Sequence, residues 1–341
     1  MTLLRTRRGR SAALLAAALA AAIGVSACSS SSGGSSSSSK IAIVAYSVPK
    51  PAYDALEKAY QNTSAGKGAT FSESFGPSGT QSKAVSTGQP ADYVAFSLEP
   101  DMTKLVPNFV ASGWNGGATK GMVSDSVVVL VVRKGNPKHI TGWADLVKPG
   151  IKIVTPDPAS SGSAKWNILA AYASVTAEGG TDAQARAYLT SFFKNVVSKP
   201  SSGSNATTTF TQGTGDVLIS YENEAIAARQ KGASVDYVVP KESILIENPA
   251  AVTAKASARA KDFLSYVLST PGQQIFASKG FRPVVAGVSP GTVPGANDPA
   301  HPFPTVEKLT TIADLGGWSK VNKDFFDPTS GIVTKIANGA G

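Results

Sequence analysis

Small hydroxyl residues and a glycine, Ser160-Ser161-Gly162-Ser163, stand between a short apolar stretch that begins at Ile153 and an Ala-rich apolar segment, 168–175. Pro156 and Pro158 end the first stretch, so the order predicts a strand, a turn and the start of a helix. The first turn of a helix has backbone N–H groups without partners inside the helix and carries a partial positive charge. Small residues let an anion approach those groups, so this stretch is a candidate anion site.

The same residues allow a second interpretation. Ser160 or Ser161 can cap the helix by accepting a hydrogen bond from its first turn. On this stretch alone, both the cap and the anion site remain open.

Two further turns have a similar composition, Gly76-Pro77-Ser78-Gly79-Thr80 and the polar run 201–207. Each precedes an expected helix. In parallel sheets, ligands bind at the carboxyl ends of the strands, which is where we place all three turns. Their coincidence favours an anion site over three unrelated caps.

The turns offer N–H and O–H groups, carry no carboxylate at the apex, and have one basic neighbour, Lys165. Neutral donors suit an anion that has no proton of its own to donate. Each charge-assisted hydrogen bond contributes about 1.5–3 kcal/mol, so several can hold a dehydrated divalent oxyanion. Phosphate at neutral pH keeps a proton and requires an acceptor.

The surrounding chain alternates between the two kinds of secondary structure, which predicts an α/β fold with mainly parallel sheets. Strands are expected at 40–46, 69–75, 91–96, 124–133, 216–221, 235–239 and 243–247. Helices are expected at 51–60, 141–146, 182–196, 258–269 and 271–278, with two short ones near 305–315 and 329–338.

Composition excludes several classes of protein. With 2 His and 1 Cys among 341 residues, these residue types cannot supply the four ligands of a structural zinc site, and an internal disulfide is impossible. The net charge is +9, but four of these charges lie in the first ten residues. The remaining chain has no clustered basic stripe, so we expect no nucleic-acid binding.

The N-terminus has the pattern of a signal peptide, with basic residues at 1–10 followed by an apolar run at 12–23. Val25-Ser26-Ala27-Cys28 resembles a bacterial lipobox, in which cleavage precedes the Cys and its thiol is acylated. The alternative is a stray or buried Cys in a secreted protein. We therefore expect a signal peptide at 1–27 and a lipidated, Ser-rich tether at 28–39, which place the protein outside the cytoplasm on the cell membrane.

Several longer stretches resemble the periplasmic sulfate-binding proteins, the receptors of sulfate/thiosulfate ABC importers. The likeness runs from about 41 to 330. The stretches that carry it are Gly-Asn-Pro-Lys at 135–138, Asp-Leu-Val-Lys-Pro-Gly at 145–150, and those at 155–167, 215–225 and 242–245.

The resemblance implies a two-lobed, periplasmic-binding-protein-like (type II) fold with the ligand in a cleft between lobes. We place lobe 1 at 40–124 and 240–341, with C-terminal helices that can pack across lobes, and lobe 2 at 125–239. It also implies a monomeric receptor, not an enzyme, that binds sulfate without a cofactor or a metal. The receptor would deliver sulfate to the permease and ATPase of an importer.

Carried over by motif, the resemblance assigns sulfate binding to Ser47, Ser78, Ser161, Gly162, Ser163, Gly203 and Tyr221. Ser47 stands where the family often has Asp and would act through its main-chain N–H. Ser163 replaces a second glycine. Tyr221 replaces a Trp whose indole donates, which leaves the preference between sulfate and thiosulfate open.

Other functions remain as alternatives. The oxyanion can instead be thiosulfate, molybdate, tungstate or phosphate, and the protein can be a tethered anion sensor. A secreted serine hydrolase would need a base near a Ser, whereas His139 and His301 are expected at the surface, beside prolines in polar turns. Glu222 and Glu224 are expected to be solvated or helix-starting acids rather than a catalytic pair.

Overall fold

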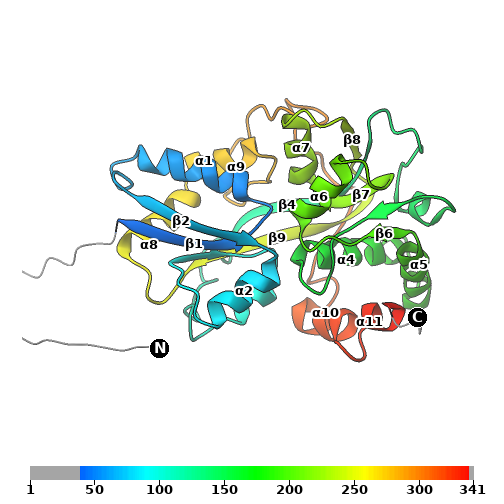
Figure 1. The fold of residues 1–341 in the computed structure, drawn as a ribbon, viewed down its shortest axis with the longest axis horizontal. Coiled ribbons are helices and arrows are strands. Elements are labelled where there is room, and N and C mark those ends of the chain that lie inside the picture. Colours follow the sequence, from blue (N-terminus) through cyan, green and yellow to red (C-terminus); the bar gives the residue numbers. More distant parts are fainter. Residues whose placement is uncertain (1–38, 338–341) are drawn as a thin grey trace, which may run out of the picture. The chain divides into compact units, whose positions relative to one another are not determined.

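Two long strands, β4 (Met122–Arg133) and β9 (Glu242–Val252), pair antiparallel with each other in the middle of the sheet (Figure 1). The computed structural model describes residues 39–337. The strand order is β2-β1-β3-β9-β4-β7-β5-β6, with β10 beside β9 and β8 beside β4.

On the β9 side, three strands are parallel to one another. They are β1 (Lys40–Tyr46), β2 (Thr70–Gly76) and β3 (Tyr93–Ala95). Their helices are α1 (Lys50–Gln61), α2 (Ser78–Ser86), α3 (Glu99–Thr103), α8 (Ala258–Val267) and α9 (Thr270–Ser278). Tyr53, Leu56 and Tyr60 are buried on one face of α1, as their helical spacing predicts.

On the β4 side, the strands are β5 (Ile153–Val154), β6 (Val196–Ser198), β7 (Val217–Tyr221) and β8 (Val235–Val238). Their helices are the 3₁₀ helix η1 (Trp143–Val147), α4 (Gly162–Thr176), α5 (Asp182–Lys194), α6 (Gly203–Thr211) and α7 (Glu222–Gln230). Helix α4 is buried over most of its circumference, which explains why its sequence is apolar without a polar face.

The C-terminal helices α10 (Gly317–Phe326) and α11 (Ile332–Ala337) lie near α4 and α5 (Figure 1). The Trp318 ring contacts Trp166 of α4 edge-on, with 5.0 Å between ring centroids. The expected helix at 305–315 is wrong. That segment holds the short strand β10 (Lys308–Thr310), which pairs parallel with β9, and the next helix begins only after Gly316, whose φ of 88° is incompatible with a continuing helix.

The α/β class is confirmed, but the expectation of mainly parallel sheets holds only for part of the sheet. Every pairing between β4 and its neighbours is antiparallel, and so is the pairing of β3 with β9. Apart from the parallel pair of β9 with β10, the long strands are antiparallel to their neighbours on both sides of the sheet, which alternation of helices and strands cannot reveal. Between residues 39 and 337, no helix combines the length and apolar character needed to cross a bilayer.

Candidate anion-binding site

The first turn of α4 is built around Ser161, which is 3% exposed and occupies the N-cap position with extended backbone angles. Its side chain makes no capping hydrogen bond, and the Ser160 hydroxyl donates instead to the carbonyl of Ser201 over 2.8 Å. The cap interpretation is therefore wrong for both side chains. The N–H of Ser161 donates to the Asp157 carbonyl over 2.8 Å, so the hydroxyl is the group with which Ser161 can still donate.

Gly162, the first residue of α4, lies directly against Ser97 at the end of β3. A Cβ at position 162 would lie 2.6 Å from Ser97 Oγ and 2.7 Å from Ser97 Cβ, closer than any side chain can approach. Only glycine fits, and it brings the backbone of α4 up to the end of β3.

Gly203 brings the start of α6 to the same place. A Cβ here would lie 2.8 Å from Ser163 Oγ and 2.9 Å from Val48, the residue after Ser47. The Ser202 hydroxyl caps α6 by accepting from the Asn205 N–H over 3.2 Å. The first turns of α4 and α6 therefore meet beside the segment that follows β1, where Ser47 is half-buried.

Ser78 opens α2 and is 2% exposed. Its hydroxyl donates to Asp101 Oδ2 over 2.7 Å and accepts from the Ser97 N–H over 3.0 Å. The hydroxyl hydrogen is thus already used, and Ser78 has its main-chain N–H to offer. The next residue, Gly79, donates its N–H to the carbonyl of Ser160 over 3.3 Å, which ties α2 to the turn before α4.

Tyr221 ends β7 and is fully buried. Its Oη lies 2.6 Å from Ser97 Oγ, and either oxygen can be the donor. Burial raises the pKa of the Tyr221 phenol, so the hydroxyl keeps its hydrogen and remains able to donate. The carbonyl of Ser97 accepts from Trp166 Nε1 over 2.8 Å and from Asn248 Nδ2 over 3.2 Å.

The structure therefore brings the three predicted turns together, and Ser47 and Tyr221 with them. The first turns of four helices, α2, α4, α6 and α7, lie around Ser97 and Ser163, and their partial positive charges favour an anion there. Sequence reasoning missed two members of this arrangement. Ser97 directly follows the strand predicted at 91–96 and has no predicted role, and Asp101 lies in a short helix that was not predicted.

Two carboxyl groups follow Tyr221 in the first turn of α7. They begin the helix, which confirms the second of the two expected alternatives, and both are buried rather than solvated. Glu222 is fully buried and pairs with Arg282 Nε over 2.8 Å. Glu224 accepts from the Thr207 hydroxyl over 2.5 Å, and burial raises its pKa to about 7. Near neutral pH, Glu224 is therefore partly protonated and opposes an anion only weakly.

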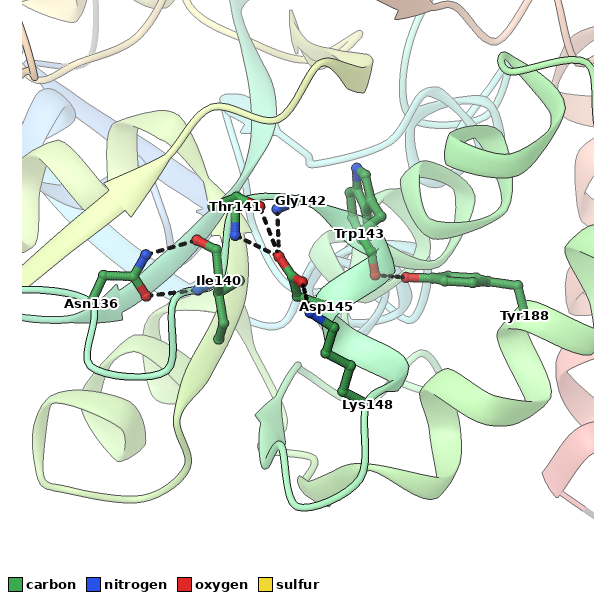
Figure 2. Close-up of polar contacts among 8 residues, drawn as sticks. All are labelled: Asn136, Ile140, Thr141, Gly142, Trp143, Asp145, Lys148 and Tyr188. Carbon is green, nitrogen blue, oxygen red and sulfur yellow. Dashed lines mark hydrogen bonds and ion pairs between the residues drawn. The ribbon is translucent and has the colours of Figure 1, made fainter.

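Two of the family-like stretches serve the fold instead of the site (Figure 2). Asn136 bridges the N–H and the carbonyl of Ile140. Asp145 accepts from the Thr141 and Gly142 N–H groups and pairs with Lys148, and these bonds lower its pKa to about 2, with the Lys148 bond as the largest cause. These stretches shape the loop after β4.

Other features lie apart from this arrangement. A cavity of about 930 Å³ opens between α4, α5 and α11, lined in part by Lys165 and Phe326, and the predicted binding residues are not among its lining residues. His139 and His301 are exposed, as expected. Within residues 39–337, no three His, Cys, Asp or Glu side chains are grouped as a metal site requires. Cys28 and the expected signal peptide lie outside the described residues.

Known proteins resemble this chain over most of its length. The profile of the bacterial extracellular solute-binding protein family matches residues 41–282. A sulfate-binding protein of Synechococcus elongatus is 39% identical over 299 residues, which cover 84% of this chain and 83% of the relative. A thiosulfate-binding protein of Escherichia coli is 32% identical, over 84% of this chain and 87% of the relative.

One solved structure is similar to this chain over a comparable share of its length. The sulfate-binding protein SubI from Mycobacterium tuberculosis is 44% identical, with a TM-score of 0.79, over 84% of this chain and 99% of that chain. The likeness therefore extends through all the segments that meet around Ser97.

Proposed function

Since this chain belongs to the bacterial extracellular solute-binding proteins, among the sulfate-binding members with their two-lobed type II fold, we propose that it is the sulfate receptor of an ABC importer. The observation that carries the proposal is the meeting of four helix N-termini and several small donors around Ser97. The family and this donor set point to the same ligand class.

A dehydrated sulfate dianion would be held by uncharged donors. The main-chain N–H groups of Ser47, Ser78, Gly162, Ser163 and Gly203 would point at its oxygens. The hydroxyls of Ser161 and Tyr221 would complete the set. Each charge-assisted bond would contribute about 1.5–3 kcal/mol. Because sulfate carries no proton at neutral pH, it has no need of a carboxylate acceptor.

We propose the same lobe boundaries that the sequence predicts, near residues 124 and 240. Strands β4 and β9 cross between them and pair over residues 122–127 and 245–249. Ligand binding would then close one lobe on the other and bury the anion. Because the ligand binds only the folded protein, sulfate should raise the melting temperature.

Titration calorimetry of the purified protein tests the proposal. We expect binding of sulfate at micromolar concentration, with thiosulfate as the nearest competitor. Heat with phosphate or molybdate and none with sulfate would contradict it. A melting temperature that rises with phosphate or molybdate, but not with sulfate, would then show that the sample is folded and that sulfate is not its ligand.

The anchor and the partners are further parts of the proposal. Acylation of Cys28 would hold the protein on the outer face of the membrane, and Cys28→Ala should release it into the medium. Measuring sulfate uptake distinguishes a transport role from a sensing role. Deleting the receptor should abolish uptake if it feeds a permease and its ATPase, and leave uptake intact if it only signals. The monomeric state is checked by light scattering.

The receptor role is favoured over a hydrolase by the surroundings of the serine hydroxyls. Both histidines are exposed, and among residues 39–337 neither is hydrogen-bonded to a serine hydroxyl. Nucleophilic serine requires a base within hydrogen-bond reach. We therefore propose a binding protein, and expect no turnover of ester or sulfate-ester substrates.

A further inference from the structure

Every polar atom of Ser97 takes part in a hydrogen bond. Its N–H donates to Ser78, its carbonyl accepts from Trp166 and Asn248, and its hydroxyl pairs with Tyr221. The Ser97 and Tyr221 side chains are both fully buried, and their oxygens are 2.6 Å apart. Ser97 thus joins α2, α4, β7 and β9 at one point, with its hydroxyl fixed beside the proposed anion.

The hydroxyl hydrogens at this point outnumber the protein acceptors. Ser97 and Tyr221 carry one hydrogen each, and their mutual bond uses one of the two. Among the described residues, the side chains of Ser163 and Asn248 also reach the Tyr221 hydroxyl. Both lower the pKa of the phenol, as hydrogen-bond donors do, so neither serves as an acceptor for its hydrogen. The Ser163 hydroxyl brings a hydrogen of its own. A buried donor without an acceptor is destabilising, so the spare hydrogen requires an acceptor that the described chain does not supply.

We propose that Ser97 is a specificity-determining residue of the anion site, and that Ser97 and Tyr221 act together as one donor whose spare hydrogen goes to the bound oxyanion. This proposal rests on the proposed function. The mutual bond can run in either direction, so either hydroxyl can present the spare hydrogen. A protonated oxyanion would add a further hydrogen where hydrogens are already in excess, which favours a proton-free dianion.

A double-mutant cycle tests the pair. Sulfate and hydrogen phosphate affinities are measured at one pH for the wild type, Ser97→Ala, Tyr221→Phe and the double variant. Each single variant keeps one hydroxyl hydrogen, so we expect it to lose less than about ten-fold in sulfate affinity. The double variant keeps none and should lose about a hundred-fold, the upper range for one charge-assisted bond. Its preference for sulfate over phosphate should fall as well.

Two controls separate this role from a structural one. Tyr53→Phe breaks another buried hydroxyl pair, the 2.9 Å bond to Tyr93, and should leave sulfate affinity unchanged. The free energy of unfolding without ligand, measured for every variant, is the second control, because a purely structural role predicts that losses of sulfate affinity follow losses of stability. If the double variant does not fold, Ser97→Cys with Tyr221→Phe, which retains the side-chain volume with a weak donor, replaces it and should lose more than either single variant.

Three outcomes would decide against us. A complete loss in Tyr221→Phe with no effect of Ser97→Ala assigns the donor to Tyr221 alone and overturns the proposal. A double variant that equals the product of the single losses, with unchanged selectivity, also overturns it. Absence of sulfate binding in the wild type would instead refute the proposed function itself.

Discussion

The hydroxyl of Ser78 gives its hydrogen to the carboxylate of Asp101 over 2.7 Å, and both side chains are buried. The same oxygen accepts from the Ser97 N–H. In the proposed site, Ser78 would therefore bind the anion through its backbone N–H, while its side chain holds α2 and the end of β3 in place.

Replacing Ser78 should consequently affect folding more than binding. In Ser78→Ala, Asp101 and the Ser97 N–H each lose a partner, and we expect a loss of about 1–3 kcal/mol in the free energy of unfolding. Sulfate affinity should fall less than about ten-fold, because the backbone donor remains. Urea unfolding and calorimetry measure the two effects. Ser86→Ala, in the last turn of the same helix, is the control, and a hundred-fold affinity loss at unchanged stability would show that the hydroxyl contacts the anion.

Ser161→Asp should abolish sulfate binding and leave the fold intact. The position is 3% exposed, so a carboxylate there would face a dianion with little screening. Asp is also a good N-cap residue, so α4 should remain stable. Calorimetry and the melting temperature without ligand check the two statements. Thr181→Asp, at the exposed N-cap of α5, is the control and should change neither the sulfate affinity nor the melting temperature. Retained sulfate affinity in Ser161→Asp would place the anion at another helix.

Gly162→Ala should weaken sulfate binding strongly. The added Cβ would meet Ser97 Oγ at 2.6 Å, so α4 must move away from β3 and take its N–H groups with it. Overpacking of this kind typically destabilises by about 1–3 kcal/mol. Gly117→Ala, where a Cβ meets nothing within 4 Å, is the matched control. Unchanged affinity in Gly162→Ala would mean that the first turn of α4 is not part of the site.

Glu224 predicts a dependence of stability on pH. Burial raises its pKa from 4.5 to about 7, so between these values the folded protein holds a proton that the unfolded chain has released. The free energy of unfolding must therefore fall as pH rises from about 4.5 to 7, by about 3 kcal/mol from this group. Denaturation measured across that range should show the fall.

Glu224→Gln is the variant that isolates this effect. The substitution should reduce the slope of the unfolding free energy against pH. Part of that slope should remain, because burial also raises the pKa of Asp125 to about 7. Sulfate affinity in the wild type should decline as Glu224 ionises above pH 7, and the Gln variant should bind equally on both sides of that pH. An identical slope in both proteins would contradict the assignment.

The donor-rich turns were predictable because their cause is local. Small residues before an apolar, Ala-rich segment predict a helix start, and α4 does begin at Gly162. The apolar run before Arg133 likewise predicted β4, which extends only two residues further towards the N-terminus. Such signals depend on neighbours in the chain, and the sequence displays them directly.

The partners of these turns were not predictable. Ser97 lies 124 residues from Tyr221 and 69 from Trp166, and its neighbours in the chain give no sign of either contact. Glu224 accepts its hydrogen bond from Thr207 of α6, 17 residues away in the chain, so its burial has no local signal in the sequence. Long-range packing decides both cases.

The bond from the Gly79 N–H to the carbonyl of Ser160 links the first turn of α2 to the turn ahead of α4. If those two segments separate when the anion leaves, this amide becomes accessible to water at that moment. Its hydrogen–deuterium exchange would then slow in proportion to occupancy, so one backbone position would report the kinetics of uptake and release without any label on the ligand.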